Sequence, residues 1–226
     1  GFEQLLDYPY GCSEQLTSRL LPLLSLRDVA RDFGVALPAN PEVVIGKTLA
    51  ELLSRQRGDG GFGMWPESRE SSVWVTPYVL FALHDAKGRG FSVPESALTR
   101  GVEYLRRELA AMPDSFTLAT SAFHLDVLAL LGKPDAGYMN SLFAARAQIP
   151  VFARALLLHA MAISKQPAAD IDTLRRELEN GLRVEANRAY FADNLGDAYA
   201  VLLDSPARTT ALVLRALLAV DPEHPL

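Results

Sequence analysis

The sequence has one cysteine, Cys12, so no disulfide can form within the chain. A single thiol suits a reducing cytosol and a periplasm equally well, so it does not identify the compartment. No apolar run approaches the roughly 18 residues that span a bilayer, and the opening GFEQLLDYPYG lacks the basic and apolar regions of a signal peptide. Clusters of Lys and Arg are also absent, and the net charge is -5. Nucleic acid and anionic membranes are therefore disfavoured as partners.

The composition is that of a folded globular protein. Of the 226 residues, 49% are hydrophobic and 22% are charged. This length can bury a sizeable core without metal or disulfide, so we expect one domain over residues 1–226. The first residues have a helical pattern and the last follow a helix directly, so we expect both ends to be cuts within a longer protein.

Helices dominate the predicted secondary structure. Apolar residues recur at spacings of three and four, and the alternation typical of strands is nearly absent. Asn40 and Pro41 have the chemistry of a helix start, and Gly132-Lys133-Pro134 that of a stop. The expected helices cover residues 13–32, 42–55, 71–86, 95–111, 116–131, 136–147, 151–163, 171–183 and 207–220.

One segment, residues 183–204, fits a helix poorly. We predict a short β-hairpin near 184–204, with a turn at Asn194-Leu195-Gly196-Asp197.

Four of the expected helices share a composition rich in Ala and Leu. They begin near Thr76, Ser121, Val151 and Thr209. Such helices, each followed by a turn, are typical of stacked helical hairpins that need a neighbour to complete their core. We expect them to form an inner layer, with charged helices such as 95–111 outside. The result is either a closed ring or an open superhelix with two concentric layers.

We call the sequence QRGDGGFGMWP, residues 56–66, the glycine-rich loop. It lacks the Lys-Ser/Thr and the preceding strand of a phosphate-binding loop, so we expect a structural turn. Its glycines permit close backbone approach, and Phe62 and Trp65 are expected to be apolar anchors. The loop resembles the Q-x-x-D-G-G-F-x-x-W turn of α/α-toroid proteins, and this resemblance favours a closed ring.

Cys12 lies in the sequence YPYGCSEQ, residues 8–15. Pro9 and Gly11 interrupt any helix, and a new helix begins at Ser13, so Cys12 is expected at a helix N-terminus. Free N–H groups and the helix dipole stabilise an anion there, which makes the sulfur a better nucleophile and a better leaving group.

Gln15 follows Cys12 by one helical turn, so the two side chains can meet. Two interpretations remain open from spacing alone. Gln15 can be a capping residue that reaches back to the helix start. Alternatively, the Cys12 thiolate can attack the Gln15 amide, expel ammonia and close a thioester.

The whole string closely resembles the thioester motif P-x-G-C-x-E-Q of the α2-macroglobulin and complement family, and most of all its bacterial members. The likeness extends to the glycine-rich loop, to WVTPYVLFAL from Trp74 and to ARTTALVLRALL from Ala207, which occur in the family's order. The resemblance implies an α/α toroid whose last helices are expected after Leu226.

The resemblance also implies the site. Cys12 and Gln15 would form the internal thioester, Glu14 is the intervening acid of the motif, and Tyr8 or Tyr10 matches an aromatic position that shields the bond from water. No external cofactor or metal is expected. A protease cleaves a bait segment elsewhere in the parent chain, the thioester is uncovered, and the protease is trapped covalently.

Such a protein is a broad-spectrum inhibitor consumed by its target, not a turnover enzyme. Its partners would be target proteases and other domains of its own chain. The resemblance further implies a role in host defence, and a periplasmic parent anchored to the inner membrane as a lipoprotein.

The expected acyl acceptor is a Lys amine. Thiols have a pKa near 8.5 and protonated Lys amines one near 10.4, so thiolate is the better leaving group and aminolysis is downhill. Some complement-type members use a histidine before the helix that corresponds to residues 117–131, to redirect the acyl group to hydroxyls. Residues 110–115, AAMPDS, contain none. His124 lies inside that helix on a different face, which leaves direct attack by amines as the favoured route.

The remaining titratable residues are expected to be structural. His84 has a capping or surface position, His159 a core position, and His224 lies in the tail. Asp126 and Asp135 have the pattern of solvated or capping acids. No grouping has the spacing of a metal site.

Three other functions remain as alternatives. An isoprenoid-processing toroidal enzyme would need an Asp-rich motif or a zinc site, and the sequence has neither. A cysteine-nucleophile enzyme could pair Cys12 with His124 or His159, but this does not explain Gln15. In a non-covalent helical scaffold that binds peptides, replacing Cys12 by Ala would leave function unchanged.

Overall fold

The computed structural model describes residues 11–27, 30, 32, 34, 37–38, 40–111, 115–193, 195 and 205–225, with residues 115–117 described by their backbone only. The chain consists of two compact units, Gly1–Glu108 and Leu109–Leu226. The expectation of a single domain over residues 1–226 stays a prediction.

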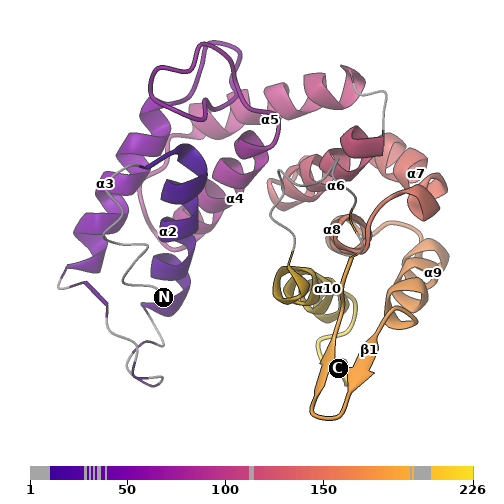
Figure 1. Ribbon diagram of the computed structural model, residues 1–226. Helices are drawn as coiled ribbons and strands as arrows, with labels where there is room; N and C mark the ends of the chain where they lie inside the picture. The colour runs from indigo at the N-terminus through magenta and orange to yellow at the C-terminus, as the bar shows by residue number, and fades with distance from the viewer. Residues whose placement is uncertain are drawn as a thin grey trace. The chain divides into compact units, whose positions relative to one another are not determined.

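The first unit is built on helix α2 (Ser13–Leu26), which packs against α3 (Pro41–Ser54) and α4 (Val75–Gly88) (Figure 1). The apolar residues of α2 recur at helical spacing and are buried, among them Leu16, Leu20 and Leu24. Helix α3 starts as predicted, with Asn40 as N-cap and Pro41 in the first turn, although the Asn40 side chain makes no capping bond. Helix α2 ends at Leu26, earlier than the predicted residue 32.

Helix α5 (Glu95–Ala111) has the predicted bounds, and the boundary between the two units falls within it. The second unit continues with α6 (Ser115–Leu130), α7 (Ala136–Ala144), a short 3-10 helix η1 (Arg146–Gln148), α8 (Val151–Ile163), α9 (Ala168–Glu179) and α10 (Pro206–Val220). The Ala-rich helix α8 packs against α6, α9 and α10 (Figure 1).

Burial within the second unit follows composition as expected. Nine of the 13 residues of α8 are buried, whereas the charged helix α9 buries only Leu174 and Leu178. The Ala-rich helices thus supply most of the core and the charged helices cover it.

The predicted hairpin exists, but it occupies a shorter stretch than 184–204. Strand β1 (Arg183–Glu185) pairs antiparallel with β2 (Arg188–Tyr190), so the turn is the two-residue link between them. The predicted turn at 194–197 lies, apart from Leu195, outside the described residues. The strand ends early because the next segment serves other elements: Asp193 accepts hydrogen bonds from the backbone of Val151 and Phe152 at the start of α8.

The structure is mostly helical with one short hairpin, as the sequence predicts. None of its described helices is long and apolar enough to cross a membrane.

Candidate functional site: the start of helix α2

Cys12 is the N-cap residue of α2 and is buried, with 7% of its surface exposed. Its extended backbone, φ -67° and ψ 165°, turns the side chain back over the first helical turn. The backbone N–H of Gln15 donates to Cys12 Sγ at 3.4 Å, and the backbone N–H of Cys12 donates to Gln15 Oε1 at 3.0 Å. Each side chain thus reaches the backbone of the other residue, one helical turn away.

This crossed pair is a capping box with a sulfur in the place of the usual hydroxyl. The capping interpretation of Gln15 is therefore correct for the free thiol that the structure contains. The same contacts also suit acyl chemistry. They hold the sulfur at the backbone N–H of Gln15 and place the Cys12 N–H on the oxygen of the Gln15 side-chain amide, where negative charge would develop if sulfur attacked.

The glycine-rich loop packs directly on the start of α2. The Ser13 N–H donates to the Met64 carbonyl oxygen at 2.8 Å, and the Ser13 hydroxyl donates to the Gly63 carbonyl oxygen at 2.6 Å. The N–H of Ser13 is one of the four at a helix start that lack an intrahelical partner, so the loop satisfies it. The two sequence motifs thus form one site.

The side chains of Gln56 and Asp59 hold the glycine-rich loop in its conformation by hydrogen bonds. The Gln56 amide donates to the carbonyls of Gly60 and Ala97, which ties the loop to itself and to α5. One oxygen of Asp59 accepts from the Gly61 N–H at 3.0 Å and from the Ser71 hydroxyl at 2.7 Å.

Close packing explains the two central glycines. A β-carbon on Gly61 would lie 2.5 Å from Ser71 Cβ, and one on Gly60, whose φ is +90°, would lie 2.3 Å from the Arg100 carbonyl oxygen. A side chain has no room at either position.

The two aromatic residues of the loop differ in burial. Phe62 is fully buried, as predicted. The expectation that Trp65 is an anchor is wrong, because 47% of its surface is exposed. The Trp65 backbone bonds to the Ser68 hydroxyl and to the Arg57 guanidinium in an exposed part of the loop, so this residue lies at the surface.

Glu14 and Gln15 are partly exposed. The Tyr78 hydroxyl of α4 lies 3.1 Å from the Ser18 hydroxyl of α2. Burial raises the pKa of Tyr78, the Ser18 hydrogen bond lowers it, and the nearby Glu14 carboxylate raises it further, with a net upward shift. Tyr78 is thus a neutral polar neighbour of the motif that sequence reasoning did not assign. Its only signal was its place in the family-like stretch WVTPYVLFAL. Tyr8 and Tyr10, the predicted shielding residues, lie outside the described residues.

Asp126 corrects one expectation. It is fully buried, and not a solvated or capping acid as predicted. Its carboxylate contacts His159 Nδ1 of α8 at 2.5 Å and accepts from Arg215 Nη1 of α10 at 3.0 Å. His159 is the predicted core histidine, and its ring is engaged by Asp126. His124 is buried on α6 in the same unit, and any role of it toward Cys12 stays a prediction.

The other predicted structural residues lie as follows. Asp135 is the N-cap of α7 and accepts from the Tyr138 N–H, as expected. His84 is half-buried within α4. Over the part of the chain that the structure describes, no group of three or more His, Cys, Asp or Glu residues could hold a metal ion.

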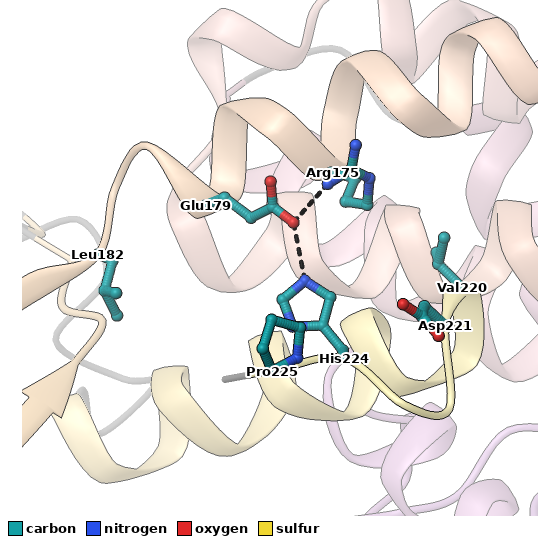
Figure 2. Close-up of a pocket in the computed structure, with 7 residues that line it drawn as sticks. All are labelled: Arg175, Glu179, Leu182, Val220, Asp221, His224 and Pro225. Carbon is teal, nitrogen blue, oxygen red and sulfur yellow. Dashed lines mark hydrogen bonds and ion pairs between the residues drawn. The ribbon is translucent and has the colours of Figure 1, made fainter.

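An open hollow of about 470 Å³ lies beside α9 and the segment after α10 (Figure 2). Of its two carboxylates, Glu179 accepts from Arg175 at 2.5 Å and contacts His224 Nε2 at 2.8 Å, and Asp221 accepts from the Glu223 N–H at 3.0 Å. These contacts join the C-terminal segment to α9. The charged groups thus satisfy one another, so this hollow is a weaker candidate than the start of α2.

The chain is similar to bacterial α2-macroglobulins in sequence and in fold. The α2-macroglobulin of Thermotoga maritima is 40% identical over 111 residues, which are 49% of this chain and 7% of that protein. The crystal structure of native Escherichia coli α2-macroglobulin, from domain MG7 to the C-terminus, matches with a TM-score of 0.74 at 22% identity, over 97% of this chain and 38% of that chain. Salmonella α2-macroglobulin reacted with methylamine matches with a TM-score of 0.72 at 25% identity, over 96% of this chain and 15% of that chain.

The chain therefore spans a small part of its relatives' length. The structural likeness shows the fold, which is the α/α toroid predicted from the sequence. The family described as the A-macroglobulin TED domain matches residues 1–127, more than half of the sequence and inclusive of Cys12, Gln15 and the glycine-rich loop. The chain belongs to the family of A-macroglobulin TED domains.

Proposed function

We propose that this chain is the thioester domain of a bacterial α2-macroglobulin that traps proteases covalently. The observation that carries the proposal is the crossed pair of contacts between Cys12 and Gln15 at the start of α2. A capping box needs only a side-chain acceptor at the N-cap, and Ser, Thr or Asp supplies a better one than Cys. Cysteine at this place adds a nucleophile one helical turn from the Gln15 side-chain amide, whose oxygen accepts a hydrogen bond from the Cys12 N–H.

In the proposed mechanism, Cys12 Sγ bonds to the Gln15 side-chain carbonyl carbon, the carbon–nitrogen bond breaks, and nitrogen leaves as ammonia with the thiol proton. A Lys amine of the protease later attacks the same carbon. The carbon–sulfur bond breaks, the sulfur leaves as thiolate, and the amine loses a proton. Gln15 is the acyl donor and remains joined to the protease through an amide.

Two groups of this site would assist. The Cys12 N–H donates to the carbonyl oxygen and would stabilise the oxyanion of each tetrahedral intermediate. Glu14, partly exposed in the first turn, would attract the cationic Lys side chain. Each molecule reacts once, so the protein is an inhibitor and not a turnover enzyme. The methylamine-reacted Salmonella structure supports amine attack by analogy.

The partners in this proposal are target proteases and the other domains of the parent chain. We further propose that the parent protein is periplasmic and anchored to the inner membrane as a lipoprotein, and that it acts in host defence. Cell fractionation with an antibody to this chain tests the location.

The test of trapping uses the full-length parent and a protease in two forms, native and with its lysines reductively dimethylated. The native protease should form a conjugate that survives boiling in detergent, and the dimethylated form should lose most of it. Cys12→Ala, or pretreatment with methylamine, should abolish it. A conjugate that persists in the Cys12→Ala parent would contradict the proposal, and one that persists with dimethylated protease would move the target from Lys to hydroxyl groups.

A further inference from the structure

Arg55 is a buried charge next to the proposed thioester. It is the C-cap of α3, only 2% of its surface is exposed, and it is among the largest fully buried side chains of the described chain. Its ion-pair partner is Glu51, one helical turn earlier and 46% exposed. Burial of a guanidinium is costly unless its donors are satisfied, so its contacts indicate what it does there.

The contacts of Arg55 lead to the residue that follows Cys12. Its Nη1 donates to the Ser13 hydroxyl oxygen at 3.3 Å and to the Met64 carbonyl oxygen at 3.4 Å. Its own carbonyl oxygen accepts from the Gly63 N–H at 3.1 Å. Ser13 in turn donates to Gly63 and Met64. We call Arg55, Ser13, Gly63 and Met64 together the Arg55 clamp.

The clamp fixes the first residue of α2, Ser13. It holds Ser13 by its backbone N–H and by its hydroxyl, and it leaves Cys12 and Gln15 free to contact each other. Arg55 Nε is buried and has no hydrogen-bond partner among the described residues. The hydrogen bonds of the guanidinium are therefore made by its two Nη atoms. A shift of about 1 Å in reacting groups can change a rate by roughly 100-fold, so a clamp one residue from the nucleophile bears on the chemistry.

We propose that Arg55 is a positioning residue for the Cys12–Gln15 thioester. It acts through Ser13 and the Met64 carbonyl, and it sets the approach of Cys12 Sγ to the Gln15 carbonyl carbon during closure and the exposure of that carbon afterwards. This role rests on the proposed thioester function, because without that bond there is nothing to position.

Three variants of the full-length parent separate charge from geometry. Arg55→Met removes the charge and keeps much of the volume. Arg55→Lys keeps the charge but loses the planar fork that serves Ser13, Met64 and Glu51 together. Ser13→Ala keeps the charge and removes one acceptor of the clamp.

Arg57→Met is the matched control. Arg57 holds the same loop through the carbonyls of Trp65 and Pro66, at 2.9 and 2.7 Å, and makes no described contact with Ser13. It therefore tests whether loosening the loop is enough to change the chemistry.

The measurements are the fraction of closed thioester after purification, by intact mass and thiol alkylation, and the rate of opening by methylamine. Thermal unfolding is compared after methylamine treatment, so that all variants start in the same open state. Both Arg55 variants should differ from wild type in at least one of two ways. The closed fraction should be lower, or the rate of opening by methylamine should change by roughly tenfold or more. Ser13→Ala should show a smaller change in the same direction, and Arg57→Met neither change.

Wild-type closure and opening rates in Arg55→Met would overturn the positioning role. An equal loss in Arg57→Met, at an equal loss of thermal stability, would overturn it too, since a general loosening would then suffice. If Arg55→Met does not fold, Arg55→Lys and Ser13→Ala decide the outcome by the same two measurements. A wild-type parent with no thioester would contradict the proposed function itself and this inference with it.

Discussion

At the scale of single residues, Cys12 and Gln15 have two roles that must be separated. Both cap α2, and the proposed chemistry uses the same two side chains. This overlap was predictable, because contacts between residues i and i+3 at a helix start depend only on local geometry. The clamp beside them was not, since Arg55 and Ser13 are 42 residues apart and their contact depends on the fold.

Gln15→Glu should separate capping from chemistry. Glutamate can accept the Cys12 N–H bond as glutamine does, so we expect thermal stability close to that of methylamine-opened wild type. It has no amide from which ammonia can leave, so no thioester should form. Gln15→Ala should lose the thioester and also roughly 1 kcal/mol of stability. A thioester in Gln15→Glu, detected by mass and by thiol protection, would contradict the assignment of Gln15 as acyl donor.

Gly61→Ala should destabilise the glycine-rich loop. The added β-carbon would lie 2.6 Å from Ser71 Oγ and 2.6 Å from Tyr104 Cε2, so we expect a loss of about 1–3 kcal/mol in denaturant unfolding. The control is Gly58→Ala in the same loop, where nothing lies within 4 Å of the added atom. Its effect should stay within about 0.5 kcal/mol. Equal effects at the two positions would show that close packing does not explain the loop's sequence.

At the scale of elements, a buried ionic cluster joins three helices of the second unit. Asp126 on α6 contacts His159 on α8 and Arg215 on α10. Sequence periodicity predicted the helices well, because it reports which face is apolar. It misjudged Asp126, because the partners that allow its burial lie 33 and 89 residues away along the chain.

Asp126→Ala should therefore be costly. It leaves Arg215 and His159 without their shared carboxylate, and breaking a buried pair typically costs about 3–5 kcal/mol. Asp135→Ala, which removes only the cap of α7, should cost about 1 kcal/mol. The comparison is made by denaturant unfolding at neutral pH. If Asp126→Ala cost no more than Asp135→Ala, the cluster would have no structural role.

The contact of Glu179 with the C-terminal segment should depend on pH. Partial burial raises the pKa of this carboxylate, but hydrogen bonds from His224 and Arg175 outweigh burial and leave the pKa below its ordinary 4.5. A lowered pKa in the folded state stabilises the fold above about pH 4.5, and this stability is lost as the pH falls through the folded-state value.

Glu179→Gln should accordingly be less stable than wild type at pH 7, and the difference should shrink at acidic pH. Thermal unfolding as a function of pH measures it. Glu223→Gln, at an exposed position of the same segment, is the control and should leave the curve unchanged. A stability difference between Glu179→Gln and wild type that grows below pH 4.5 would contradict the downward shift of the Glu179 pKa.

At the scale of the whole molecule, the structure unites motifs that are distant in sequence. The thioester motif and the glycine-rich loop were predicted separately, as a reactive site and as a packing turn. Their union at Ser13 shows that the turn also builds the site. The fold class followed from helical periodicity and Ala-rich composition. The exposure of Trp65 and the bounds of the hairpin could not be predicted in this way, because they depend on the tertiary contacts of each segment.

The central claim is a covalent bond between Cys12 and Gln15 in the parent protein. Intact mass spectrometry of the freshly purified, untreated parent tests it most directly. We predict a mass lower than the encoded one by one ammonia, with Cys12 closed to alkylation until methylamine opens it and leaves one methylamine at Gln15. A parent that has its encoded mass and a freely alkylated Cys12 from the outset would contradict the claim.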